Sequence, residues 1–371
     1  MNINNLTILK MKALKFNTAL LILTFFALTV SAQKEKDKIA EKEIHKEFQA
    51  SQKTVLDLNN KFGDIRIKDW DQNEIKIDVK VSVYNCNPEK AQKNLDKISI
   101  SFSEKENVIY AKTEIGENSE SSFFETVSKN CSFQIDYEVS IPRYLMMNIK
   151  NKFGNIHINE IHGKTNIDLG FGDLRANNMI FESSQEISKV EVEYGNVSIG
   201  TCTWVDFDLG FSDLKVDKAT ALTIKAKYSD IEIDQAEVVK ADLSFGDFKT
   251  ENINKMDIYA SYTDVKLGRV KSELMADLQF GDFHLKNAAK GFKTITIAGQ
   301  YADIKVGFDK GASYTLSARA SYGDVTVPNN TVAIEEREFS KKANGIVGGS
   351  PGSSTLTITS GFGDVTIYYA E

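Results

Sequence analysis

Hydrophobic and polar residues alternate one by one through most of the chain after residue 54, which is the pattern of β-strands with one buried face. The run before Tyr228 shows it, because Ile224 and Ala226 alternate there with lysines. The run after Tyr228 continues the same way, with Ile231 and Ile233 on either side of a glutamate. The chain is therefore predicted to be mostly β, with pairs of short strands joined at a bend.

The bend carries a recurring motif of an aromatic residue, a small residue and then Asp or Asn. The aromatic residues of the motif are Phe62, Phe153, Phe171, Tyr194, Phe211, Tyr228, Phe245, Tyr262, Phe280, Tyr301, Tyr322 and Phe362. The acidic residues include Asp173, Asp213, Asp230, Asp247, Asp264, Asp282, Asp303 and Asp324. The small residue is mostly Gly, but Ser212, Thr263 and Ala302 also occur, so small size is the shared requirement.

Repetition at a short period predicts a solenoid, in which each coil stacks on its neighbours and none buries its apolar face alone. The motif recurs every 17 residues from Tyr194 to Tyr262 and every 21 residues from Phe280 to Tyr322. These spacings predict a parallel β-solenoid (β-helix) with coils of about 17–21 residues.

Phe and Tyr motifs alternate, and the two kinds have different residues two positions before the ring. Leu243 precedes a Phe motif, whereas Ala260 precedes the next Tyr motif. Either short coils place leucine over alanine to fill the core, or the true coil is a double unit of 34 residues. We favour the short coil, and both arrangements stay open at this point.

The motif residues are expected to have structural roles. Simple alternation puts Tyr228 on the same face as Ala226, so the aromatic side chains are predicted to point inward and stack. The acidic residues are predicted to form a column and to accept hydrogen bonds from backbone N–H groups just ahead. Calcium in this column is the alternative, but calcium-binding solenoids use a double glycine, and neutral Asn155 and Asn196 occupy the same position here.

The first residues predict export. Residues 1–32 contain three lysines, an apolar run at 19–28 and the sequence Val-Ser-Ala at 30–32, which is the order of regions in a signal peptide. The apolar run is short for a membrane span. The mature chain is therefore expected to begin near Gln33, to contain no membrane span, and to be periplasmic, on the outer surface or secreted.

The rest of the chain divides into three parts. Residues 33–53 are densely charged and are predicted to be a solvated leader, helical at most in part. Residues 54–150 are predicted to be a β-rich cap with one short helix at 88–97, which covers the strand edges at the solenoid's N-terminal end. Residues 151–371 carry the solenoid repeats, with an exposed Gly/Ser-rich loop at 341–354.

Charge and cysteine content limit which partners, disulfides and cofactors are expected. Lys and Arg number 45 against 52 Asp and Glu, and no basic stripe with aromatic residues occurs, so nucleic acid is excluded as the expected partner. Three cysteines in an exported chain allow one disulfide, for which Cys86 and Cys131 are the favoured pair; the alternative is three free thiols with Cys202 buried. No Cys-x-x-Cys pair exists to hold zinc, and no cofactor is predicted.

None of the candidate catalytic or metal-binding patterns in the sequence supports a site. His157 and His284 occupy a position that holds Lys or Arg in other repeats, so they are predicted to be surface residues, and the nearby pair His157 and His162 is not favoured as a metal site. Residues 348–352 match Gly-x-Ser-x-Gly, but Pro351 lacks the N–H that an oxyanion hole needs. The prominent acidic residues all belong to the repeat, so no general acid can be nominated and no enzyme activity is expected.

The repeated aromatic-Gly-Asp motif, the Ile141-Pro142 step ahead of Phe153-Gly154-Asn155 and the signal peptide together resemble the bacterial putative-adhesin family (domain-of-unknown-function family 4097). The resemblance covers residues 55–369 and implies an exported β-helix without established catalysis. We therefore expect a non-enzymatic scaffold or adhesion-like binding module of the envelope or cell surface, with an envelope protein or a glycan as partner. The alternative is a carbohydrate-active or glycan-binding β-helix, which would show exposed aromatic residues and convergent carboxylates in a groove.

Overall fold

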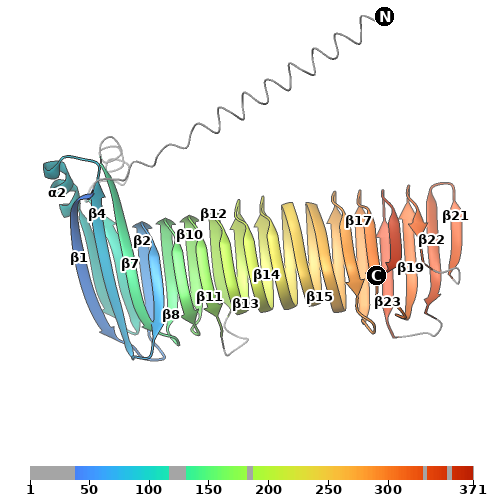
Figure 1. The fold of residues 1–371 in the computed structure, drawn as a ribbon, viewed down its shortest axis with the longest axis horizontal. Coiled ribbons are helices and arrows are strands. Elements are labelled where there is room, and N and C mark those ends of the chain that lie inside the picture. The colour runs from blue at the N-terminus through green and yellow to red at the C-terminus, as the bar shows by residue number, and fades with distance from the viewer. Residues whose placement is uncertain (1–37, 117–130, 182–186, 329–331, 349–352, 371) are drawn as a thin grey trace, which may run out of the picture.

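The computed structural model describes residues 38–116, 131–181, 187–328, 332–348 and 353–370. The expected signal peptide and the start of the charged leader lie outside these residues. Figure 1 shows an elongated solenoid, in which the strands of successive coils lie side by side along a rod. One hydrophobic core runs through it, formed by the inward residues of the strands.

Each central coil has the predicted short length. In β13 (Val197–Gly210) and β14 (Leu214–Lys227), Val197 lies beside Leu214, and in β15 (Ile231–Gln279) Ile231 lies beside Leu214. All these pairings are parallel and step by 17 residues, which confirms the parallel β-solenoid and excludes the 34-residue coil. The flanking coils are formed by β8 (Met146–Phe153), β9 (Ile156–Ile161), β10 (Thr165–Phe171), β11 (Leu174–Met179), β12 (Ser188–Tyr194), β16 (Phe283–Ala288), β17 (Thr294–Gln300) and β18 (Ile304–Phe308).

Leucine and alanine alternate in the stacked core, as the short coil requires. Leu209 lies beside Ala226, which lies beside Leu243, and all three are at most 4% exposed. A large side chain in one coil therefore fills the space left by a small one in the next, which keeps the packing density native-like.

The first coil is inserted between coils formed later in the chain. Its strand β2 (Val55–Phe62) pairs with both β6 (Val108–Ile115) and β8, and its strand β3 (Ile65–Trp70) pairs with both β7 (Ser132–Pro142) and β9. Two further strands close this end: β4 (Glu74–Tyr84), antiparallel to β7, and β5 (Ile98–Lys105), antiparallel to β6.

The leader prediction was wrong. Residues 38–49 form β1 (Lys38–Gln49), which pairs antiparallel with β4 and is the outermost strand on that side. Its charged residues find partners across the strand pair: the Lys80 ammonium lies 3.2 Å from the Glu41 carboxylate and 3.6 Å from that of Glu43. A charge-rich sequence can thus form an edge strand when the neighbouring strand has complementary charges.

The predicted helix is present as α2 (Pro88–Asp96). Asn87 caps it by accepting a hydrogen bond from the Lys90 N–H, and Ala91 and Leu95 are buried. Just before it, Cys86 forms a disulfide with Cys131, with Cα atoms 4.9 Å apart. This is the pairing that the sequence favoured, and it ties the end of β4 to the start of β7.

The last coil of the sequence is not the last coil of the stack. Its strands β23 (Thr355–Ser360) and β24 (Val365–Tyr369) lie between β17–β18 on one side and β19 (Tyr314–Ser321) and β20 (Val325–Thr326) on the other. Figure 1 accordingly shows the C-terminus inside the stack.

An antiparallel pair of strands closes the C-terminal end. It consists of β22 (Ser340–Val347), which pairs with β19, and β21 (Ala333–Arg337), which pairs with β22. The prediction of a loop at 341–354 was therefore wrong for residues 341–347, which are strand. Residues 349–352 of that range, which contain most of the Gly-x-Ser-x-Gly match, lie outside the described residues.

Candidate functional site

The aromatic residues of the motif form a continuous column along one edge of the solenoid, which we call the aromatic ladder. Among the described residues its successive rings are Phe62, Phe153, Phe171, Tyr194, Phe211, Tyr228, Phe245, Tyr262, Phe280, Tyr301, Phe362 and Tyr322. Neighbouring ring centroids are 4.6 to 5.3 Å apart, and the planes differ by at most 14°. Phe133 packs edge-on against the first ring and Phe339 lies tilted against the last.

The rings are stacked as predicted, but the prediction that they point inward was wrong. From Phe171 onward each is 41–61% exposed. The reason is that the rings lie in the bend, where one residue has a positive φ: it is the aromatic residue itself from Phe211 to Tyr322, with φ between 52° and 62°, and the following glycine after Phe171, Tyr194 and Phe362. A left-handed residue interrupts the strict alternation of strand faces, so the ring turns outward.

The same conformation explains the small residue that follows the ring. Ser212, Thr263 and Ala302 are at most 3% exposed, because the bend turns this position inward against the neighbouring coil. A Cβ atom at Gly246 would lie 2.1 Å from the carbonyl oxygen of Ser229. In the coils of Phe171 and Tyr194 the positive φ falls instead on the glycine, at 141° and 159°.

Beside the ladder runs a column of acidic side chains, which we call the aspartate column. Asp230 N–H donates to Oδ1 of Asp213 at 3.0 Å, and Asp247 N–H donates to Oδ1 of Asp230 at 2.8 Å. Asn155 takes part in the same way, because its side-chain oxygen accepts from the Asp173 N–H at 2.9 Å. The acceptor role was predicted, but the donor lies one coil away and not within the same bend, so these side chains join coils.

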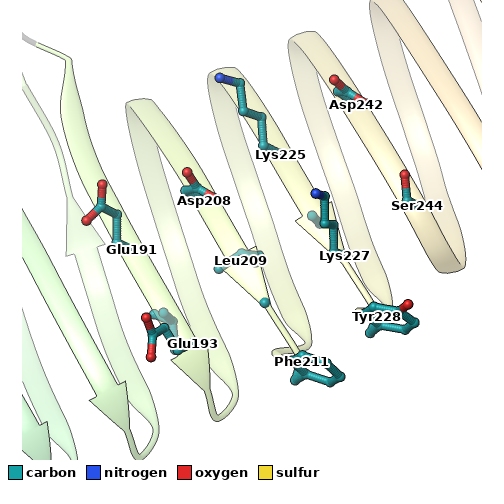
Figure 2. A pocket seen from close by; sticks show the side chains of 13 residues that line it. Glu191, Glu193, Asp208, Leu209, Phe211, Lys225, Lys227, Tyr228, Asp242 and Ser244 are labelled. Carbon is teal, nitrogen blue, oxygen red and sulfur yellow. The ribbon is translucent and has the colours of Figure 1, made fainter.

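On the other side of the ladder lies an open depression of about 710 Å³ that crosses four coils. Figure 2 shows Phe211 and Tyr228 at its lower border, where the bend lies. Asp208, Lys225 and Asp242 follow one another in register along its strand face. The depression combines exposed ring edges with both acidic and basic side chains, a surface suited to polar ligands.

The opposite strand face carries a predominantly basic row. Lys215 and Lys249 flank Glu232, with ammonium–carboxylate distances of 3.7 and 4.0 Å. His284 lies in this row between Lys266 and Lys305, as the sequence predicted. Burial, followed by these neighbouring lysines, lowers the pKa of His284, so its imidazole is neutral at pH 7.

The remaining candidates have structural surroundings. His157 lies in register with Arg66 and Arg175, and the His162 Nε2 atom lies 2.8 Å from the Glu160 carboxylate. Within the described ranges, no group of three or more His, Cys, Asp or Glu side chains is arranged to hold a metal ion. The unpaired cysteine, Cys202, is buried, and burial raises the pKa of its thiol to about 12.

Where carboxyl pKa values shift, they shift downward. Hydrogen bonds from Lys38, from Lys255 and from Lys341 lower the pKa of Glu41, Glu273 and Asp324 respectively. These carboxylates thus form ion pairs and remain charged at neutral pH. No helix in the described part of the chain is long and apolar enough to cross a membrane.

Comparison with solved structures gives distant neighbours. A putative cell adhesion protein from Clostridium sporogenes is 15% identical, with 89% of this chain and 100% of that chain covered and a TM-score of 0.20. Putative adhesins from Bacteroides fragilis and Parabacteroides merdae are 14% and 8% identical, cover 89% of this chain and 98% and 97% of their own, and have TM-scores of 0.31 and 0.33.

No curated protein matches the chain. Residues 189–368, which contain the ladder from Tyr194 onward and both C-terminal coils, match the family model described as Toastrack DUF4097. This agrees with the resemblance that the repeated aromatic-Gly-Asp motif indicated. Over these residues, the chain is similar to the Toastrack DUF4097 family.

Proposed function

We propose that the protein is a non-enzymatic, exported β-solenoid that serves as a scaffold or adhesion-like binding module of the envelope or cell surface. One observation carries the proposal: the side chains that stand out chemically recur in rows along the rod and do not converge in one cleft. The aromatic ladder, the aspartate column and the row of Asp208, Lys225 and Asp242 all follow the coil repeat. Such rows offer an extended binding surface.

The way both ends are built supports a scaffold role. The coil of β2 and β3 and the coil of β23 and β24 are each held between two other coils, so neither lies at an end of the stack. Antiparallel strands then cover the outer coils. The outermost strands, β1 and β21, are rich in charged residues, which discourage pairing of their free edges with other chains.

The electrostatics also favour binding over catalysis. A general acid needs a raised carboxyl pKa, whereas Glu41, Asp69, Glu273, Asp309 and Asp324 have lowered values. In the depression, Lys225 lies between the carboxylates of Asp208 and Asp242, an arrangement that suits a polar partner.

Export is tested first. N-terminal sequencing of the protein recovered from envelope and medium fractions should show cleavage after Ala32. Recovery of an uncleaved form confined to the cytoplasm would contradict the proposal.

Binding is tested with two matched variants of the full mature chain. The first replaces Asp208, Lys225 and Asp242 with alanine, which removes the charges of the depression. The second replaces Lys215, Glu232 and Lys249, which carry the inverse charge pattern on the opposite face. Capture of a defined partner from solubilised envelopes should be lost in one variant and kept in the other; equal capture by both would argue against a binding face on either side.

A glycan-binding or carbohydrate-active β-helix is the second candidate, and the depression favours it. The carboxylates of Glu191 and Asp208, which lie side by side in neighbouring coils, line this hollow and can accept hydrogen bonds from sugar hydroxyls. Isothermal titration with soluble polysaccharides, followed by a reducing-end assay, separates the two forms of this candidate. Binding without new reducing ends supports a glycan-binding module, and release of reducing ends would show an enzyme.

A further inference from the structure

We propose that the aromatic ladder is the interface between two copies of this chain, which lie side by side and parallel, with a two-fold axis along the length of the rod. This goes beyond the proposed function, because it concerns how the rods assemble and not what their faces bind.

The first argument is area. An aromatic side chain has roughly 150–250 Å² of surface, and the ladder residues from Phe171 onward are 41–61% exposed. Their exposed surface is on the order of 1,000 Å² per copy, or about 2,000 Å² for two copies, which reaches the size of a stable protein interface. Unpartnered apolar patches on monomers are rarely larger than a few hundred Å².

The second argument is the chemistry of the exposed surface. Both faces of an inner ring are covered by its neighbours, as Tyr228 is by Phe211 and Phe245 at 4.9 Å. A sugar that stacks on an aromatic platform needs a free ring face, and only ring edges are exposed here. Ring edges pack well against other rings and aliphatic groups.

The third argument is spacing. The rungs repeat every 4.6 to 5.3 Å along the whole edge, the distance between neighbouring strands. A second ladder has the same repeat, so rings of two copies can meet rung by rung over the full length. A partner with a different repeat would lose this match within a few coils.

The charges beside the ladder decide the orientation. The aspartate column lies on one side, and the residues that immediately precede the rings lie on the other. An antiparallel pair would bring one aspartate column against the other, so that rows of carboxylates repel. A parallel pair brings each aspartate column against the partner's row of preceding residues.

The sequence of those preceding residues fits the parallel pair. At the Tyr228 rung, Lys227 would face the partner's Asp230, which is an attractive pair. The row contains one acidic residue from Phe62 to Phe362, Glu193, and at that rung the aspartate column carries neutral Asn196. No rung therefore places two carboxylates opposite each other.

Sedimentation of the full mature chain tests the association. We expect twice the monomer mass at micromolar concentration. Replacing Phe211, Tyr228, Phe245 and Tyr262 together with asparagine, which tolerates the left-handed conformation of these residues, should give a monomer with an unchanged circular dichroism spectrum. The matched control replaces exposed apolar residues away from the ladder, Ile187, Val238 and Met275, with asparagine and should remain a dimer.

Single-cysteine variants test the orientation and do not depend on the asparagine variant folding. Tyr194 and Phe362 are the fourth and eleventh of the twelve rings and have ordinary φ, so Tyr194→Cys and Phe362→Cys suit their backbones. In the parallel dimer each new thiol meets its own copy across the axis, so both variants should form disulfide-linked dimers on mild oxidation. An antiparallel dimer brings at most one of these rungs onto its axis, so cross-linking of one variant or of neither overturns the parallel arrangement. A monomeric wild-type chain overturns the interface itself.

Discussion

Asp247 donates its backbone N–H to the Oδ1 atom of Asp230, 17 residues earlier, at 2.8 Å. The bond joins the same position of two neighbouring coils. Equivalent bonds occur toward both ends of the column, where Asp64 accepts from the Asn155 N–H and Asp303 accepts from the Asp364 N–H. The side chain of one coil thus satisfies a backbone donor that the bend leaves outside the strand ladder. This relationship explains why Asp and Asn are interchangeable here, since both supply an acceptor oxygen.

Asp230 therefore stabilises the solenoid by accepting a hydrogen bond. We expect Asp230→Asn to change the free energy of unfolding by less than about 0.5 kcal/mol and Asp230→Ala to lower it by roughly 1–2 kcal/mol. Denaturant melts measure both. Chelator should leave the melting temperature unchanged; a strong fall on adding chelator, with Asn as harmful as Ala, would show instead that calcium occupies the column.

The ladder rings should contribute less than buried rings. Phe245 is 42% exposed and stacks on two neighbours, at 4.9 and 5.0 Å, so Phe245→Ala should cost about 1–2 kcal/mol. Phe248, at 0% exposure, is the matched control, and Phe248→Ala should cost about 3–5 kcal/mol. Equal losses in denaturant melts would contradict the exposed ladder.

Backbone conformation provides a second test at the same residue. Phe245 has a φ of 62°. Alanine adopts this conformation only at a free-energy cost, whereas glycine adopts it without one. Phe245→Gly should therefore be more stable than Phe245→Ala by about 1 kcal/mol. In an ordinary strand position the order would be the reverse.

Local sequence patterns were sufficient to predict the repeated parts of the fold. The alternation around Leu209 and Ala226 predicted the strands, and the 17-residue spacing predicted the coil. Pro88 in the first turn, with Ala91 and Leu95 on one face, predicted the helix. They failed at the bend: Tyr228 follows Ala226 at strand spacing, but the bend, in which one residue has a positive φ, interrupts the alternation and the ring is exposed. The residue types do not show whether the positive φ falls on the aromatic residue, as at Tyr228, or on the glycine that follows it, as at Gly195.

The sequence also did not show which strands pair with each other. Phe362 carries the same motif as its neighbours, and nothing in its pattern shows that its ring lies between those of Tyr301 and Tyr322. Likewise, the charges of β1 suggested a solvated leader, because their partners on β4 are far away in sequence. The depression beside the ladder also depends on stacking, since its residues come from four coils.

The coil of β23 and β24, which lies between two other coils, should stabilise the C-terminal end of the solenoid. Ile358 is 0% exposed and lies between Ile297 and Ala318 of the two flanking coils. Ile358→Ala should lower the free energy of unfolding by about 2–5 kcal/mol and should selectively reduce the hydrogen-exchange protection of β19 and β22. Ile224→Ala is the control, because Ile224 is equally buried in the middle of the solenoid. Uniform loss of protection in both variants would show that the end does not depend on this coil.

Asp309 is the centre of a hydrogen-bond network near the same end. Its carboxylate accepts hydrogen bonds from Arg269 at 3.2 and 2.7 Å, from the Asn287 amide at 2.7 Å and from the Lys290 N–H at 3.0 Å. These bonds, those from Arg269 first, lower the pKa of Asp309 from its ordinary 3.8 to about 2. The folded chain therefore holds this carboxyl group ionised at a pH where the unfolded chain has protonated it.

This difference gives a pH dependence with a definite sign. Because the pKa is lower in the folded state, the stabilisation by Asp309 is fully present above about pH 4 and is lost as the pH falls toward about 2. The gap in unfolding free energy between the wild type and Asp309→Asn should therefore narrow between pH 4 and pH 2. Asp242→Asn, on the exposed strand face, is the control and should show a small gap throughout. A gap for Asp309→Asn that stays constant over this range would mean that the network does not depend on the charge of the carboxylate.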